Sequence, residues 1–91
     1  AILTNARMDK TAMNKIASMA HNGYARAIRP VHTMADGDSI YALSVGNVIS
    51  DINAVGTLSA YVMAKAIANG VRAAKGACGL LAARDLEQNK A

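Results

Sequence analysis

The sequence predicts an α/β chain that contributes a β-α-β-α unit to a larger fold. Two long stretches with helical spacing of apolar residues alternate with two short β-prone runs. The 91 residues include no Phe or Trp, and the apolar content relies on alanine, so each side chain buries little area. Because two strands alone rarely form a stable sheet, we expect the remaining strands and core to come from a second polypeptide.

The first half of the chain has the pattern of a strand, a helix and a loop. Residues 1–6 form a β-prone run that favours a strand. Asp9 is an N-cap signal for a helix that extends to about Ile28, and Arg29-Pro30 ends it because the residue before a proline avoids helical conformation. The predicted packing face of this helix has apolar residues spaced by threes and fours: Met13, Ile16, Ala17, Ala20, Tyr24 and Ala27.

The second half predicts a strand and two helices. Residues 31–38 are expected to form a loop, and residues 39–45 a strand that is covered on both faces because neither carries charge. Asp51 can cap a second long helix that ends near Ala74. Gly56 and Gly70 weaken this helix, so we expect each where another element approaches closely. Residues 76–79 indicate a turn and residues 80–87 a short last helix. The predicted packing face of the long helix comprises Ile52, Val55, Ser59, Val62, Ala66, Ile67 and Gly70.

Composition argues against several classes of function. The net charge of +4 comes from scattered basic residues without interleaved aromatic rings, which argues against nucleic-acid binding. Cys78 stands alone, so we expect no disulfide framework, no zinc-ligand set and no other metal or cofactor, in a reduced, cytoplasmic setting. Charges and glycines interrupt the apolar stretches well before the ~20 residues that span a bilayer, so no membrane segment is predicted.

The chain begins inside a β-prone run, with no Met and no leader. A signal peptide would show a basic start, a longer apolar core and a small-residue cleavage site, and none is present. We therefore expect Ala1 to follow a cut made in a longer polypeptide.

The main chemical feature is the motif Asp36-Gly37-Asp38. Gly37 permits a tight turn, and residues two apart in an extended segment point to the same face, so the two carboxylates can converge. Two close carboxylates suit the handling of a proton or an amine. On its own, such a motif before a strand is more often a simple turn. The pattern of a calcium loop is absent.

The position of four further residues indicates their roles. His32 and Met34 lie in the loop that leads to Asp36, and we predict that they line the substrate-binding site. His21 falls within the first helix and is expected to be a structural or interface residue. Ser44 lacks the flanking glycines of a nucleophile elbow.

Three short motifs resemble a known family. They are N-A-R at residues 5–7, M-A-H-N-G at 19–23 and R-P-V-H-T-M-A-D-G-D at 29–38. With them the chain resembles the small (β) chain of the self-cleaving N-terminal-nucleophile hydrolases, which include L-aminopeptidase/D-esterase, β-peptidyl aminopeptidase and 6-aminohexanoate-oligomer hydrolase. The resemblance is close over the first half, and from Asp51 onward it depends on the Ala/Gly-rich helix.

The resemblance implies a layered α-β-β-α sandwich in which residues 1–91 are the C-terminal part of one hydrolase domain. The larger α chain would come from the same precursor, which cuts itself just before a Thr or Ser that becomes the nucleophile. Asp36 and Asp38 match the branch with a Thr nucleophile, where they hold and polarise that residue. The resemblance also implies a homo-oligomer of such heterodimers.

The implied activity is hydrolysis of a peptide or amide through an acyl-enzyme, with oxyanion donors and an assisting Lys or Asn from the α chain. Ala1 cannot act as the nucleophile, and Thr4 falls where the family has an ordinary strand residue. The nucleophile is therefore expected a few residues before Ala1. Two alternatives remain: acyl transfer similar to that of ornithine acetyltransferase, and a non-catalytic assembly subunit if Ala1 is the true terminus.

Overall fold

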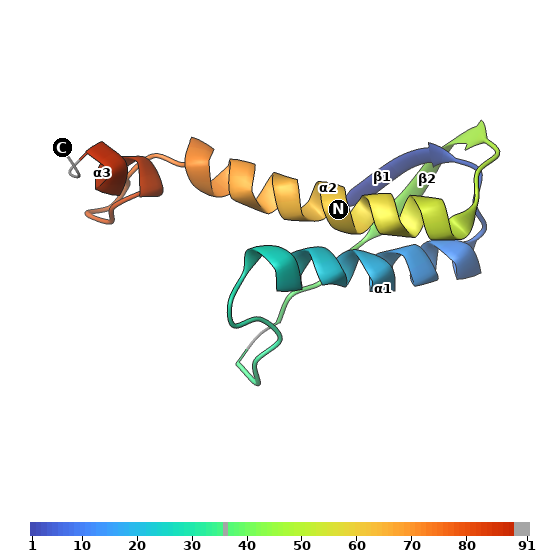
Figure 1. Cartoon of the computed structure of the whole chain (residues 1–91), viewed down its shortest axis with the longest axis horizontal. Helices are drawn as coiled ribbons and strands as arrows, with labels where there is room; N and C mark the ends of the chain where they lie inside the picture. The colour runs from blue at the N-terminus through green and yellow to red at the C-terminus, as the bar shows by residue number, and fades with distance from the viewer. Residues whose placement is uncertain (36, 89–91) are drawn as a thin grey trace.

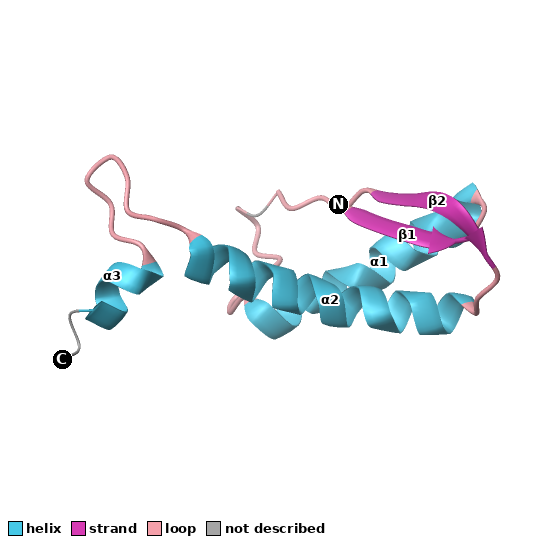
Figure 2. Cartoon of the chain, turned by 90° about the horizontal axis from the view of Figure 1, so that it is seen from above, coloured by secondary structure: helices cyan, strands magenta, loops and turns pink. Residues whose placement is uncertain are grey.

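The computed structural model describes residues 1–35 and 37–88, which form a mixed α/β structure (Figure 1). The elements are β1 (Ile2–Ala6), α1 (Lys10–Ala27), β2 (Ala42–Val48), α2 (Ile52–Ala73) and α3 (Ala83–Gln88). The predicted β-α-β-α order is confirmed. Both long helices lie on the same side of the two strands (Figure 2).

The two long helices begin at the residues that the sequence indicates. The Asp9 carboxylate accepts a hydrogen bond from the Ala12 amide at 2.8 Å, and Asp51 accepts one from Ala54 at 3.1 Å. Each bond satisfies one of the amide groups that a helix start leaves without an intrahelical partner. The first helix ends at Ala27, two residues before Arg29-Pro30, as predicted.

The strands pair in parallel, with a bulge in β2. The paired residues are Ile2 with Ala42, Leu3 with Leu43, Thr4 with Ser44, and Ala6 with Val48. Gly46 lies in the bulge against the backbone of β1, since a Cβ atom at Gly46 would come within 2.6 Å of the Asn5 carbonyl oxygen. A side chain at this position would therefore push the two strands apart.

The predicted limits of the second strand were wrong by three residues at each end, because the strand covers Ala42–Val48 instead of 39–45. Pairing begins only at Ala42 because β1 begins at its partner Ile2. Gly46 and Asn47, which directly follow the predicted strand, are accommodated as the bulge.

Glycines allow α1 and α2 to approach closely. Met19 and Gly23, one turn apart on α1, face Gly56 and Ala60, one turn apart on α2. A Cβ atom at Gly23 would lie 2.6 Å from the Ala60 carbonyl oxygen and 2.6 Å from the Met63 Cβ, and one at Gly56 would overlap the Met19 sulfur. The expectation of a close approach is confirmed at Gly56.

The expected packing face of α2 was wrong at Val62 and Gly70, whereas Ile67 packs against the core as predicted. Gly70 has no neighbouring atom within 4 Å of its ideal Cβ position, and Val62 is exposed while Met63 is buried. Gly70 is open because α1 ends at Ala27 and does not reach the last turns of α2.

The last helix also begins later than predicted, at Ala83 instead of residue 80. Ala77 and Leu80 exchange two backbone hydrogen bonds, which hold Leu80 in the preceding turn. The Asp85 carboxylate then accepts a hydrogen bond from the Ala82 amide at 2.9 Å and stabilises the first turn of α3.

The core between the sheet and the helices is small. Its buried residues are Ile2, Met13, Ile16, Ala20 and Met63. On the opposite face of the sheet the paired Leu3 and Leu43 are 68% and 47% exposed, and Val45 is 65% exposed. Within the described residues this face of the second strand is therefore open. The radius of gyration is 16.0 Å, against about 12 Å for a compact domain of this length.

Candidate active site

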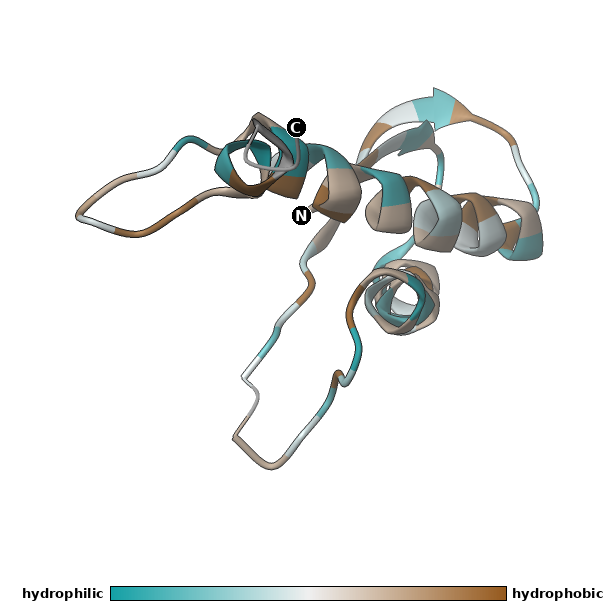
Figure 3. Cartoon of the chain, turned by 60° about the vertical axis from the view of Figure 1, so that its left-hand side comes forward, coloured by the Kyte–Doolittle hydropathy of each residue, from teal (hydrophilic) through white to brown (hydrophobic). Residues whose placement is uncertain are grey.

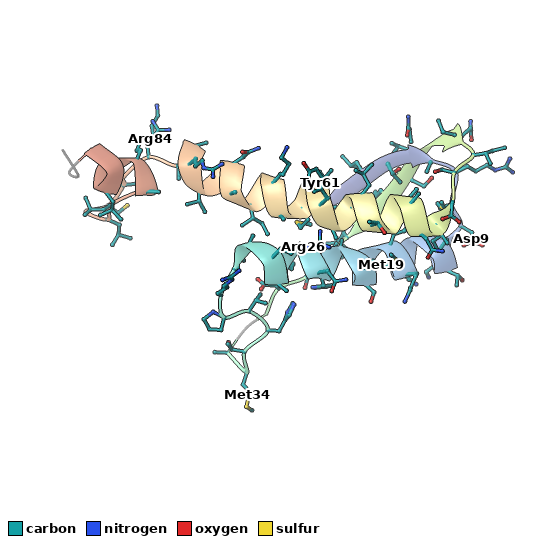
Figure 4. The ribbon with its side chains drawn as sticks, viewed as in Figure 1. Asp9, Met19, Arg26, Met34, Tyr61 and Arg84 are labelled. Carbon is teal, nitrogen blue, oxygen red and sulfur yellow. The ribbon has the colours of Figure 1, made fainter. Side chains whose placement is uncertain are left out.

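Residues 28–41 form the loop that connects α1 to β2 and carries the acidic motif. Loops of this length without secondary structure are uncommon in compact domains and are usually functional. The loop leaves the end of α1 and projects away from both helices, with Met34 at its tip (Figure 4). Figure 3 shows the same projection from another side. The peptide bond between Arg29 and Pro30 is cis.

Three rings hold the beginning of this loop against α1. His21 and Tyr24 are one turn apart on the helix, with ring centroids 5.4 Å apart. The His32 ring, from the loop, lies 5.5 Å from His21 and 6.4 Å from Tyr24 in edge-on or tilted orientations. These separations lie within the range in which aromatic rings attract one another.

The end of the loop is tied to the same helix. The Tyr24 hydroxyl donates a long hydrogen bond of 3.4 Å to the Ser39 carbonyl oxygen. The Tyr24 backbone carbonyl accepts the Ile28 amide at 2.8 Å and so ends the helix. Tyr24 therefore contacts the helix terminus, His32 near the start of the loop, and Ser39 near its end.

His32 has an unusual backbone conformation. Its φ angle is +59°, in the left-handed region that non-glycine residues rarely adopt. Such a conformation costs about 1–3 kcal/mol and persists where surrounding contacts hold it. The contacts of the His32 ring with His21 and Tyr24 stabilise this backbone conformation.

The structure describes three of the four site residues predicted from the sequence, and it does not bring His32 and Met34 together. His32 packs against α1, whereas Met34 is fully exposed at the far tip of the loop. Asp38 is exposed and directly precedes Ser39. Asp36 lies outside the described residues. The contacts of His21 and Tyr24 with the loop were not predicted from the sequence, although the three-residue spacing of these two residues indicates a shared helix face.

The start of β1 lies at the same edge of the sheet as the end of the loop that carries the acidic motif. The strands are parallel, so both begin at one edge, and the Ile2 amide donates a hydrogen bond of 2.8 Å to the Tyr41 carbonyl. Asp38 lies three residues before Tyr41 along the chain. The first residue of β1 and the end of the acidic loop are therefore neighbours.

The hydroxyl groups of the two strands take part in structural hydrogen bonds. The Thr4 Oγ1 accepts the Ala6 amide at 3.1 Å, and the Ser44 hydroxyl donates to the Ala6 carbonyl at 2.6 Å. Among the described residues neither hydroxyl bonds to a histidine or a carboxylate, so neither shows the arrangement of an activated nucleophile.

A groove of about 290 Å³ runs between β1 and α2. Its walls are formed by residues 1–6 with Val48 and Ser50, and by Val55, Leu58, Ser59 and Val62 of α2. The Ser59 hydroxyl donates a hydrogen bond of 2.7 Å to the Val55 carbonyl of its own helix. Most of the residues that line the groove are apolar, and none has a charged side chain.

Within the described ranges, 1–35 and 37–88, no three His, Cys, Asp or Glu side chains gather in a way that could hold a metal ion. Over the same residues, no helix combines the length and the apolar character needed to cross a membrane.

Comparison with known proteins agrees with the motifs. An uncharacterized aminopeptidase of Mycobacterium tuberculosis (strain ATCC 25618 / H37Rv) is 34% identical over 100 residues, which cover 93% of this chain and 29% of that protein. A 6-aminohexanoate-oligomer endohydrolase of Paenarthrobacter ureafaciens is 38% identical over 48 residues, 53% of this chain and 14% of that protein.

The chain thus spans less than a third of the length of these relatives. No solved structure is significantly similar to it. The model of Peptidase family S58 matches residues 1–84, and the chain therefore belongs to this family.

Proposed function

We propose that this chain is the small, C-terminal part of an amide-bond hydrolase that acts through an N-terminal nucleophile. Membership of Peptidase family S58 and the relatives named aminopeptidase and 6-aminohexanoate-oligomer endohydrolase support the amide-hydrolase activity. The observation that carries the proposal is the meeting of the β1 start with the acidic loop at one edge of the sheet.

In this proposal the nucleophile is a Thr, or a Ser, in the residues that precede Ala1 and is freed by autocleavage of a precursor. Ile2 bonds to Tyr41 in a parallel ladder. A backbone continued backward from Ala1 along the strand direction would therefore run beside Ile40, Ser39 and then Asp38. The carboxylates of the acidic motif would therefore lie close to an N-terminal residue that precedes Ala1 in this strand.

The chemistry is acyl transfer to water. The hydroxyl oxygen of the nucleophile attacks the amide carbonyl while its proton passes to the free α-amine of the same residue. The tetrahedral intermediate collapses, the C–N bond breaks, and the amine leaves with that proton. Water then hydrolyses the ester, which releases the acid and restores the hydroxyl. Asp36 and Asp38 hold and polarise the N-terminal residue, and His32 and Met34 contact the peptide or amide substrate.

A larger α chain from the same precursor completes the proposed enzyme. The paired Leu3 and Leu43 and the neighbouring Val45 form an open apolar face on the sheet. A second sheet packed on this face would complete a layered α-β-β-α sandwich and bury these side chains. The α chain would supply the oxyanion donors and an assisting Lys or Asn, and the heterodimers would assemble further in the cytoplasm.

The test uses the complete protein, assayed with amino-acid p-nitroanilides and with 6-aminohexanoate oligomers. We expect Asp38→Asn and Asp36→Asn each to lower kcat by about 100-fold or more, the usual scale for a lost catalytic proton-handling group. Asp9→Asn is the matched control, because it makes the same chemical change at an N-cap where Asn is equally effective.

Unchanged kcat in both acidic-loop variants would contradict the proposed site. Transfer of an acetyl group from N-acetylornithine to another amine, without hydrolysis of any amide in the panel, would favour the acetyltransferase alternative. A complete protein that catalyses neither reaction would favour the assembly subunit.

A further inference from the structure

We propose that His21 and Tyr24 are positioning residues that hold the acidic loop at both ends and so fix where Asp38 lies. The inference rests on the proposed function, in which Asp38 orients the nucleophile. It concerns two residues of α1 that the proposed chemistry itself does not use.

At the start of the loop the anchor is a ring cluster. His32 contacts both helix rings, at 5.5 Å from His21 and 6.4 Å from Tyr24. His32 also has the left-handed φ of +59°, so the chain turns at the residue where it touches the helix. The Nδ1 atom of His21 is buried and has no hydrogen-bond partner among the described residues, which is consistent with a packing role for this ring.

At the end of the loop the anchor is a hydrogen bond. The Tyr24 hydroxyl donates to the carbonyl of Ser39, the residue that follows Asp38. The next residue, Ile40, packs against the buried core, and Tyr41 bonds to Ile2. Asp38 therefore lies directly beside the point at which the loop becomes fixed.

The two anchors share one residue and one helix. A loop tied at only one end could move its acidic residues by several ångströms, whereas a misplacement of about 1 Å at a catalytic group is enough to reduce a rate substantially. Because Tyr24 contacts both His32 and Ser39, the span between them is closed by a single side chain. This arrangement gives α1 control over the position of Asp38.

Hydrogen exchange measured by mass spectrometry on the complete protein tests the anchor without reference to activity. We expect faster amide exchange in peptides covering residues 31–41 for His21→Ala and for Tyr24→Phe, which removes only the hydroxyl. Tyr61→Phe is the matched control, because it removes the same hydroxyl from a half-exposed ring on α2. We expect His21→Phe to restore slow exchange, since it keeps a ring in the cluster.

Kinetics test the consequence for catalysis. We expect kcat to fall about three- to tenfold in His21→Ala and about two- to fivefold in Tyr24→Phe, the scale of a lost ring contact and a lost hydrogen bond. KM should change by less than about twofold, because neither residue touches substrate. In the double variant of His21→Ala with His32→Ala, the loss of kcat should be smaller than the product of the two single losses, because each single variant already removes the His21–His32 contact.

Unchanged exchange in both His21→Ala and Tyr24→Phe would overturn the inference whatever the activity. Faster exchange with unchanged kcat would overturn the catalytic part, as would multiplicative losses in the double variant or a rise in KM alone. If the unmodified protein hydrolyses no amide, the proposed function fails, and the exchange result still decides whether α1 anchors the loop.

Discussion

Replacement of Gly23 by alanine tests the packing of the two long helices that supports the site. Gly23 lies on the helix that carries His21 and Tyr24, about one turn before the helix ends. A Cβ atom at Gly23 would lie 2.6 Å from the Ala60 carbonyl oxygen and 2.6 Å from the Met63 Cβ atom.

The expected loss of stability follows from these contacts. Inserting a group into a packed core costs about 1–3 kcal/mol, and the upper end applies here because a backbone carbonyl cannot rotate away as a side chain can. Alanine regains about 1 kcal/mol over glycine in helix propensity. We therefore expect Gly23→Ala to lower the free energy of unfolding by about 2 kcal/mol.

Urea unfolding of the complete protein measures this difference, and Gly70→Ala is the matched control. Gly70 lies inside α2 with nothing within 4 Å of its ideal Cβ position, so alanine there should raise stability by up to about 1 kcal/mol. The same substitution thus has opposite signs at the two positions. Equal stability of the two variants, or a Gly23→Ala protein more stable than the unmodified one, would refute the reasoning.

Three further predictions concern caps and hydrogen bonds. Asp9→Ala should lower the free energy of unfolding by about 1 kcal/mol, while Asp9→Asn stays within about 0.5 kcal/mol in the same urea assay; equal losses would contradict a capping role. Ser44→Ala removes the 2.6 Å hydrogen bond to the Ala6 carbonyl and should cost about 1 kcal/mol, so an unchanged urea midpoint would count against that bond. Arg84 donates to the Ala73 carbonyl at 2.7 Å, so Arg84→Ala should speed limited proteolysis of residues 74–82, and an unchanged cleavage rate would show that this contact does not hold α3.

Local signals predicted the helices well, because their limits depend on neighbouring residues. Asp9 and Asp51 cap the two long helices as predicted, and Arg29-Pro30 follows closely on the end of the first. Strand limits depend on a partner far away in the chain, so the second strand was displaced by three residues. Gly56 and Gly70 are both glycines inside the second long helix, but α1 packs against Gly56 and ends before it could pack against Gly70.

The candidate site was predictable only in part. The acidic motif was assigned to a loop because glycine and two aspartates favour a turn, and the structure has a loop there. The contact of His21 and Tyr24 with His32 could not be predicted, because it depends on the loop folding back onto the helix that precedes it. Met34 lies at the tip of the same loop, away from both helices (Figure 4).

The most direct test of the proposed mechanism is the N-terminal sequence and intact mass of the small chain in the purified complete protein. The proposal predicts a chain that begins with Thr, or Ser, a few residues ahead of Ala1, with a separate larger chain from the same precursor. An uncleaved polypeptide through this position, or a small chain that begins at Ala1, would contradict an N-terminal nucleophile held by the acidic loop.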